Sequence, residues 1–250
     1  MKDWRIVGAS VRGTAHHHSG HPCQDASAWL LDPAMACLAV ADGAGSRPHA
    51  DLGATAAVQA VLRWARKGPP PDDDLAAWLS RAADEALAAV LAAAAAERRP
   101  AEDYACTLCV AVLTPSRLGL IQLGDGIAVV GDAVGFTTLS PPARTEYANE
   151  TVFLTSPQAS AQLRVDVLDL EPVDSVALST DGLRFKILSD LGSHRPHVPF
   201  FEDAARLARD PAVGDTAVAD FLSRVDDQSG DDKTLVIAVR TAAPPAGKEP

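Results

Sequence analysis

The sequence has few aromatic residues and few positive charges. Aromatic residues make up 5% of the 250 residues, and 22 lysines and arginines stand against 33 aspartates and glutamates, a formal net charge of −11. Nucleic acids and anionic membranes attract basic surfaces, so this balance argues against non-specific binding to either. It is compatible with a metal site or with a basic partner protein.

A long apolar run is also missing. The longest one, Ala86 to Ala96, is alanine-rich and shorter than the about 20 residues that a membrane-spanning helix needs. The first residues, Met1 to Ile6, include no apolar stretch of signal-peptide length. We therefore expect a soluble, cytoplasmic protein with no membrane partner.

Cysteine is scarce, with only Cys23, Cys37, Cys106 and Cys109. Their mainly apolar surroundings are typical of buried thiols in a reducing compartment. Cys106 and Cys109 have C-x-x-C spacing, but they lie in a β-like run, where residues three apart point to opposite faces. We interpret them as packing residues rather than as a redox or zinc pair.

The order of strand-like and helical segments predicts an α+β fold in one domain, residues 1–241, with a disordered tail at 242–250. Helices are expected at 51–66, 75–98, 201–209 and 213–224. Strands are expected at 6–10, 28–31, 35–41, 106–113, 118–123, 127–130, 136–139, 163–168, 175–179 and 234–240. A histidine-rich loop at 13–24 and a polar flap at 140–162 interrupt these elements.

Four short strings combine a β-like run with an aspartate beside glycine or another aspartate. Three runs end in Asp42-Gly43, Asp125-Gly126 and Asp181-Gly182, and the fourth begins after Asp231-Asp232. Any one Asp-Gly is typical of a hairpin turn. Strands stacked in one core can, however, bring such ends together on one rim, where carboxylates repel each other unless a divalent cation neutralises them. The recurrence of the pattern makes a metal site the leading hypothesis.

The donor atoms in these strings are oxygens. The glycine after Asp42 leaves its backbone carbonyl accessible as a further oxygen ligand. Oxygen donors select Mg²⁺ or Mn²⁺ over zinc or copper. Two ions about 3.5–4 Å apart are a known device for the hydrolysis of phosphate esters.

The order of the motifs resembles that of the PP2C-type (PPM family) metal-dependent serine/threonine protein phosphatases. The matching strings are Gln24-Asp25, Asp42-Gly43, Gly124-Asp125, Thr180-Asp181-Gly182 and Asp231-Asp232-Lys233-Thr234. Residues 22–26 and 146–155 resemble a bacterial subgroup of the family. The resemblance covers about residues 6–240. It implies a PP2C-like α-β-β-α sandwich of two antiparallel sheets flanked by helix pairs, with Mn²⁺ or Mg²⁺ at one end.

The same resemblance implies roles for individual residues. Asp42 would bridge two ions, and Gly43 would offer its carbonyl oxygen. Asp181 and Asp231 would hold one ion, and Asp25 would reach the other, directly or through water. Asp42, Asp181 and Asp231 are therefore the expected catalytic residues.

Two further aspartates have separate expectations. Asp125 matches the position that, together with Asp181, binds a third and weaker ion in many relatives. Asp232 stands where the family often has asparagine, so we expect it to lie beside the ligands rather than among them.

The implied function is hydrolysis of phosphoserine and phosphothreonine in proteins. A hydroxide shared by two cations is nucleophilic at neutral pH and attacks phosphorus in line with the leaving oxygen, without a covalent intermediate. The implied partners are a phosphorylated protein and a Ser/Thr kinase that phosphorylates it.

Three positions depart from the family pattern. Gly20 stands where many relatives have an arginine that grips phosphate, Gln24 where many have glutamate, and Ala44 where some have histidine. We interpret the histidines at 16–18 and 21 mainly as a polar surface loop, with a phosphate-binding or proton-donating role as the sharper alternative. The candidates for substrate contact are Arg12, Arg47, His16, His21 and His49.

These departures keep two other functions open. One is a PP2C-fold binding or regulatory module with weak or no activity. The other is a phosphoesterase that acts on a small molecule.

Overall fold

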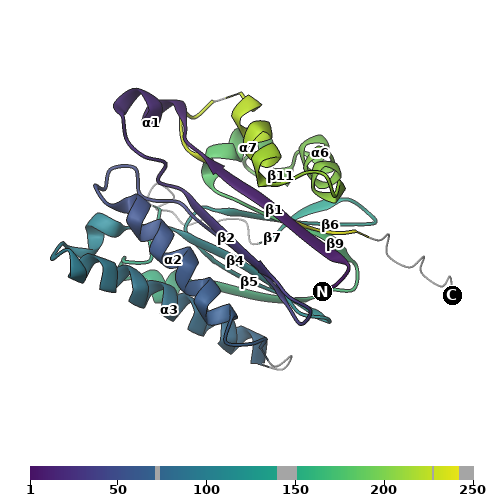
Figure 1. Ribbon diagram of the computed structural model, residues 1–250, viewed down its shortest axis with the longest axis horizontal. Helices are drawn as coiled ribbons and strands as arrows, with labels where there is room; N and C mark the ends of the chain where they lie inside the picture. Colours follow the sequence, from purple (N-terminus) through teal and green to yellow (C-terminus); the bar gives the residue numbers. More distant parts are fainter. Residues whose placement is uncertain (71–73, 140–150, 227, 242–250) are drawn as a thin grey trace.

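Two five-stranded antiparallel sheets are stacked between two layers of helices (Figure 1). The computed structural model describes residues 1–70, 74–139, 151–226 and 228–241. In strand order, the first sheet comprises β1 (Trp4–Val11), β12 (Lys233–Arg240), β9 (Val173–Ser179), β6 (Ile127–Asp132) and β7 (Phe136–Leu139). The second comprises β2 (Ala26–Leu31), β3 (Ala36–Ala41), β4 (Leu108–Leu113), β5 (Arg117–Leu123) and β8 (Arg164–Asp169).

A pair of helices covers the outer side of each sheet (Figure 1). The second sheet carries α2 (Ala50–Ala65) and α3 (Leu75–Ala96), and the first carries α6 (Val198–Arg209) and α7 (Asp215–Arg224). This arrangement confirms the expected α+β sandwich.

Alternation along the strands divides the apolar side chains among three layers of core. In β3, Leu38 and Val40 pack between the two sheets, whereas Cys37 and Ala39 pack against α2 and α3. In β12, Val236 and Ala238 lie between the sheets, and the odd-numbered Leu235, Ile237 and Val239 contact the α6–α7 layer. Because successive strand residues point to opposite faces, one run supplies two cores, which is why β3 and the 235–239 stretch of β12 are continuously apolar.

Three of the four cysteines, Cys37, Cys106 and Cys109, are buried in these cores, whereas Cys23 is half-buried and lies outside them. All four are free thiols. Cys106 packs in the α2–α3 layer and Cys109 between the sheets, so the two point to opposite sides and form no redox or zinc pair.

Several short elements were not expected from the sequence. The histidine-rich segment, predicted as a loop, contains the helix α1 (Thr14–Ser19), and the polar segment after β7 contains α4 (Ala159–Gln162). The others are η2 (Ala101–Tyr104), η3 (Asp181–Leu183), α5 (Arg184–Ile187), β10 (Leu188–Asp190) and β11 (Arg195–Pro196). Such pieces are too short for hydrophobic periodicity to reveal them.

Two segments for which the sequence makes predictions lie wholly or partly outside the described residues. These are residues 140–150 of the flap and the tail at 242–250. The described remainder of the flap is anchored to the second sheet, because Val152 and Leu154 are buried and the Leu154 N–H donates to the Cys106 carbonyl at 2.8 Å. Within the part of the chain that the structure describes, no helix is long and apolar enough to cross a membrane.

Candidate metal centre

The predicted aspartates stand at one end of the sandwich because their strands are antiparallel neighbours. Ala26 pairs with Ala41, so Asp25 precedes β2 where Asp42 follows β3. In the other sheet, Ser179 pairs with Leu235, which brings the end of β9 beside the start of β12. Asp181, after β9, and Asp231, before β12, therefore lie close together, as Asp25 and Asp42 do. Asp125 joins them from the turn between β5 and β6.

Asp42 lies at the centre of this group. Burial raises the pKa of its carboxyl well above the usual range, and the charges of Asp25, Asp181, Asp231 and Asp125 raise it further. One carboxylate oxygen from each of Asp42, Asp125 and Asp181 lies within 4.8 Å of the others. Carboxylates this close cannot all be ionised without a cation between them.

Asp25 is buried with one of its two oxygens free. Its side chain is 8% exposed, and Oδ2 accepts hydrogen bonds from the Thr180 and Thr234 hydroxyls, both at 2.7 Å. Oδ1 has no hydrogen-bond partner among the described residues. Burial is the main reason that the pKa of Asp25 rises to about 8. A buried carboxylate oxygen without a hydrogen-bond partner is suited to bind a cation.

Asp181 and Asp231 complete the set. Burial, followed by the charges of Asp125 and Asp231, raises the pKa of Asp181 to about 6. Burial also raises the pKa of Asp231. The donor set consists of oxygens with raised proton affinity, which suits a hard divalent cation such as Mn²⁺ or Mg²⁺.

Gly43 holds the Asp42 turn tightly against its surroundings. Its N–H donates to the Gln24 carbonyl at 3.1 Å. A Cβ atom at this position would stand 2.8 Å from the carbonyl oxygens of both Ala50 and Gln24, closer than real contacts allow. The backbone carbonyl that was expected to offer a ligand therefore belongs to a residue that must be glycine.

We expect Gly43→Ala to lower the free energy of unfolding by about 2–3 kcal/mol, because both obstructing groups are backbone and cannot rotate away. Urea denaturation checks this. Gly214→Ala is the matched control, since a Cβ there meets nothing within 4 Å. Equal stability of the two variants would contradict the close packing of the Asp42 turn.

Asp125 is tied to the flap. The turn before it depends on Gly124, whose φ of +94° lies in the left-handed region. The Thr151 hydroxyl donates to Asp125 Oδ2 at 2.8 Å. Asp125 thus joins the acidic group and connects it with the described end of the flap.

Asp232 lies beside the acidic group, and its carboxylate accepts hydrogen bonds from the protein on both oxygens. It is 2% exposed and accepts hydrogen bonds from the backbone N–H groups of Gly13 and Gln24. His16 Nδ1 lies 2.9 Å from its Oδ2. These contacts support the expectation that Asp232 stands next to the ligands and orients other groups.

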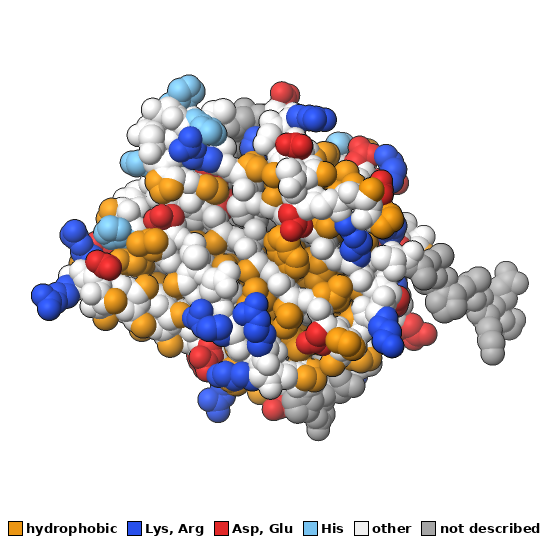
Figure 2. Space-filling model, viewed as in Figure 1, with side chains coloured by type: hydrophobic (Ala, Val, Ile, Leu, Met, Phe, Trp, Pro, Cys, Tyr) orange, Lys and Arg blue, Asp and Glu red, His pale blue; other side chains and the backbone are white. Residues whose placement is uncertain are grey.

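The remaining candidates for substrate contact are scattered around this end. The Arg12 guanidinium donates hydrogen bonds to His17 Nδ1 and to the His21 carbonyl. The His49 ring stacks on the Tyr104 ring, with 5.1 Å between the ring centroids. Arg47 is exposed, and its carbonyl accepts a hydrogen bond from the Gln24 side chain. Figure 2 shows several histidine side chains at the corner where α1 lies. Contact of Arg47, His21 or His49 with substrate stays a prediction.

Sequence reasoning missed the hydroxyls that support the aspartates. Thr107 Oγ1 accepts a hydrogen bond from the Asp42 N–H at 2.9 Å, as Thr180 and Thr234 hold Asp25. Thr180 and Thr234 stand inside the Asp-containing strings, which was the available signal, but only the tertiary structure assigns their partner.

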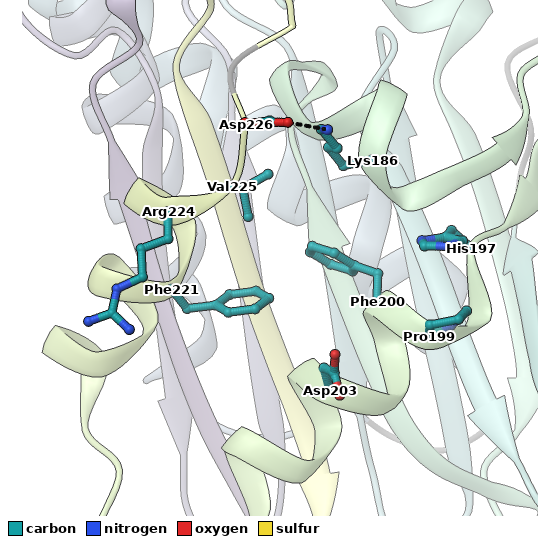
Figure 3. A pocket seen from close by; sticks show the side chains of 9 residues that line it. All are labelled: Lys186, His197, Pro199, Phe200, Asp203, Phe221, Arg224, Val225 and Asp226. Atoms are coloured by element: carbon teal, nitrogen blue, oxygen red, sulfur yellow. Dashed lines mark hydrogen bonds and ion pairs between the residues drawn. The ribbon is translucent and has the colours of Figure 1, made fainter.

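A separate open pocket lies between α6 and α7, beside α5 (Figure 3). Its volume is about 470 Å³, and Phe200 and Phe221 form its apolar wall, with an ion pair of 3.4 Å between Lys186 and Asp226 at its edge. None of the aspartates of the acidic group lines this pocket; its own acidic residues, Asp203 and Asp226, belong to no metal-ligand expectation.

A cluster of half-buried carboxylates at the end of a two-sheet sandwich defines a candidate site for divalent cations. The family model for protein phosphatase 2C matches residues 12–223. The serine/threonine-protein phosphatase 3 of Escherichia coli (strain K12) is 32% identical over 252 residues, 94% of this chain and 98% of the relative. The chain belongs to the protein phosphatase 2C family.

Solved structures share the fold. The serine/threonine phosphatase Stp1 of Staphylococcus aureus superposes with a TM-score of 0.67 at 15% identity, covering 94% of each chain. The catalytic domain of the serine/threonine protein phosphatase PstP, solved with two manganese ions, has a TM-score of 0.67 at 20% identity, covering 94% of this chain and 97% of that one.

Proposed function

We propose that this protein hydrolyses phosphoserine and phosphothreonine in proteins in a reaction that depends on two Mn²⁺ or Mg²⁺ ions. The observation that carries the proposal is the convergence of five aspartates, largely buried and with four raised pKa values, in a chain of the protein phosphatase 2C family. Those aspartates are Asp25, Asp42, Asp125, Asp181 and Asp231.

In this proposal each residue has a defined role. Asp42 would be the ligand common to both ions and Gly43 would offer its carbonyl oxygen, while Asp181 and Asp231 would hold one ion and Asp25 the other. When bound, such cations lower the pKa of water and offset the charge on phosphoryl oxygens. The hydrogen bonds from Thr180 and Thr234 keep Asp25 oriented, so that little reorganisation is needed on binding.

Asp125 and Asp181 are the proposed ligands of a third, weaker ion. Their oxygens lie within the same 4.8 Å cluster as those of Asp42. The hydrogen bond that the Thr151 hydroxyl donates to Oδ2 of Asp125 would help to orient this carboxylate toward a cation. Arg47, His16, His21 and His49 remain the proposed residues for substrate contact.

The substrate, the partner kinase and the cellular location are also part of the proposal. A phosphorylated protein, produced by a partner Ser/Thr kinase, is the expected substrate. Four free cysteines suit a reducing compartment, which supports a cytoplasmic location.

Removal of metal tests the function directly. With Mn²⁺, we expect turnover of p-nitrophenyl phosphate and of a phosphothreonine peptide, and we expect a chelator to abolish both until Mn²⁺ is restored. A panel of nucleotides and sugar phosphates serves as the comparison. Absence of metal-dependent turnover would favour a binding module, and selective turnover of the small molecules would favour a different phosphoesterase.

A further inference from the structure

The helical turn that begins at Asp181 has two of its three sides packed against the protein. The Arg184 N–H donates to the Asp181 carbonyl and closes the turn. Gly182 faces the loop that carries Asp231, because a Cβ atom at Gly182 would overlap a backbone carbonyl of that loop. Leu183 is fully buried in the core beneath α6 and α7. Since a 3₁₀ turn has about three residues, Arg184 stands one turn beyond Asp181 on the remaining side.

The Arg184 guanidinium lies near the acidic group without being bound by it. Burial and neighbouring carboxylates raise the pKa of Asp181, whereas the positive charge of Arg184 lowers it, an effect that weakens with distance. Among the residues that the structure describes, none accepts a hydrogen bond from this guanidinium or forms an ion pair with it. The side chain is half-buried and lies over the Phe185 ring, with 5.6 Å between the guanidinium carbon and the ring centroid. Its five N–H donors are therefore available to a ligand.

The arginine that many relatives use to grip phosphate has no equivalent at Gly20. Gly20 ends α1 with a φ of +77°, in the left-handed region, where a side chain is strained. The nearby Arg12 is already engaged, since its guanidinium donates to His17 Nδ1 and to the His21 carbonyl. Arg184 differs from both positions because its charge acts on an expected metal ligand and its donors are not used within the described structure.

We propose that Arg184 binds the phosphoryl group of the substrate and so supplies the contact that Gly20 does not provide. The proposal rests on the proposed function, because the phosphate must approach the cations held beside Asp181. A guanidinium can donate two parallel hydrogen bonds to a phosphate, and its positive charge favours the approach of a dianion to an acidic centre. The Phe185 ring supports the guanidinium through a cation–π contact.

The test uses inorganic phosphate as the probe, with the protein saturated with Mg²⁺. Titration calorimetry should show that Arg184→Ala weakens phosphate binding by about 10- to 100-fold. With a phosphothreonine peptide, KM should rise by a similar factor while kcat changes less. Arg184→Lys keeps the charge but lacks the planar fork, so it should recover only part of the affinity.

The matched control is Lys186→Ala. Lys186 lies two residues further along α5 and points toward Asp226, with which it forms an ion pair of 3.4 Å (Figure 3). This control removes the same charge from the same short helix, and it should leave the phosphate affinity and KM unchanged. An equal loss in the two variants would overturn the proposal, because it would show a general effect of charge. Unchanged phosphate affinity in Arg184→Ala, or no phosphate binding by the wild-type protein, would overturn it as well.

Binding of Mn²⁺ separates substrate contact from a structural role of Arg184. Removal of a positive charge beside Asp181 should leave the Mn²⁺ affinity of Arg184→Ala equal to or higher than that of the wild-type protein. A lower affinity would show that Arg184 maintains the turn, and would contradict the proposal. Failure of the proposed function is distinguishable, because a protein without turnover that still binds phosphate through Arg184 would contradict the phosphatase assignment alone.

Discussion

Asp42→Asn should lower kcat/KM for a phosphothreonine peptide in Mn²⁺ by about 1,000-fold or more, equivalent to about 4 kcal/mol of lost transition-state stabilisation. Asp42 is the carboxylate whose pKa is raised by all four of the other aspartates, so it stands between the atoms that would bind separate ions. Asparagine has nearly the same shape but lacks the charge and the second oxygen that a bridging ligand needs. Steady-state kinetics over a range of Mn²⁺ concentrations measures the effect.

The matched control is Asp169→Asn. Asp169 is exposed and pairs with Arg117 at 2.6 Å on the outer strands of the second sheet. A surface ion pair of this kind contributes about 0–1 kcal/mol to stability, so turnover should be unchanged. Turnover by Asp42→Asn close to that of the control would rule out the proposed centre, and rescue at high Mn²⁺ would show that the substitution weakens binding rather than chemistry.

The strands and the aspartates at their ends could be predicted from the sequence better than the side chains that surround those aspartates. The apolar runs within the predicted strands 35–41 and 234–240 indicate buried strands, because each run supplies side chains to two cores. The aspartates at these ends then meet by antiparallel pairing. Their convergence could be expected once the family resemblance supplied the strand order, which local patterns do not give.

The surroundings of the aspartates could not be predicted in the same way. Asp25 and Thr180 are 155 residues apart, and His16 and Asp232 are 216 apart. No periodicity links such positions. The histidine-rich segment was interpreted as a loop because helix α1 has too few residues to show an apolar stripe, yet its contacts with the Asp231 loop give His16 its place beside the acidic group.

Removing metal should make the stability of the protein fall as pH rises from 5 to 8. The pKa of Asp25 rises to about 8 and that of Asp181 to about 6 in the folded chain, whereas both are about 3.9 in an unfolded chain. Between these values the folded state binds more protons than the unfolded state, so the free energy of unfolding decreases with pH. We expect the Tm in chelator to be at least about 5 °C lower at pH 8 than at pH 5.

Asp42→Asn should reverse part of that loss. It removes one buried carboxylate from the group, and with it the repulsion that it exerts on Asp181 and Asp231. In chelator at pH 8, the variant should therefore be more stable than the wild-type protein by about 1–3 kcal/mol, even though it is inactive. At pH 5 the difference should shrink, because protonation has already relieved the repulsion.

Saturating Mn²⁺ should invert the order of the two proteins. Cations bind the ionised carboxylates of the folded state, so the wild-type Tm should rise most at pH 8, and the variant should gain little. Thermal unfolding of both proteins and of Asp169→Asn, with chelator and with Mn²⁺ at each pH, measures all of these differences. A wild-type Tm in chelator that increases from pH 5 to pH 8 relative to Asp42→Asn would contradict the assignment, because carboxylates that prefer to be ionised in the folded state need no cation to hold them together.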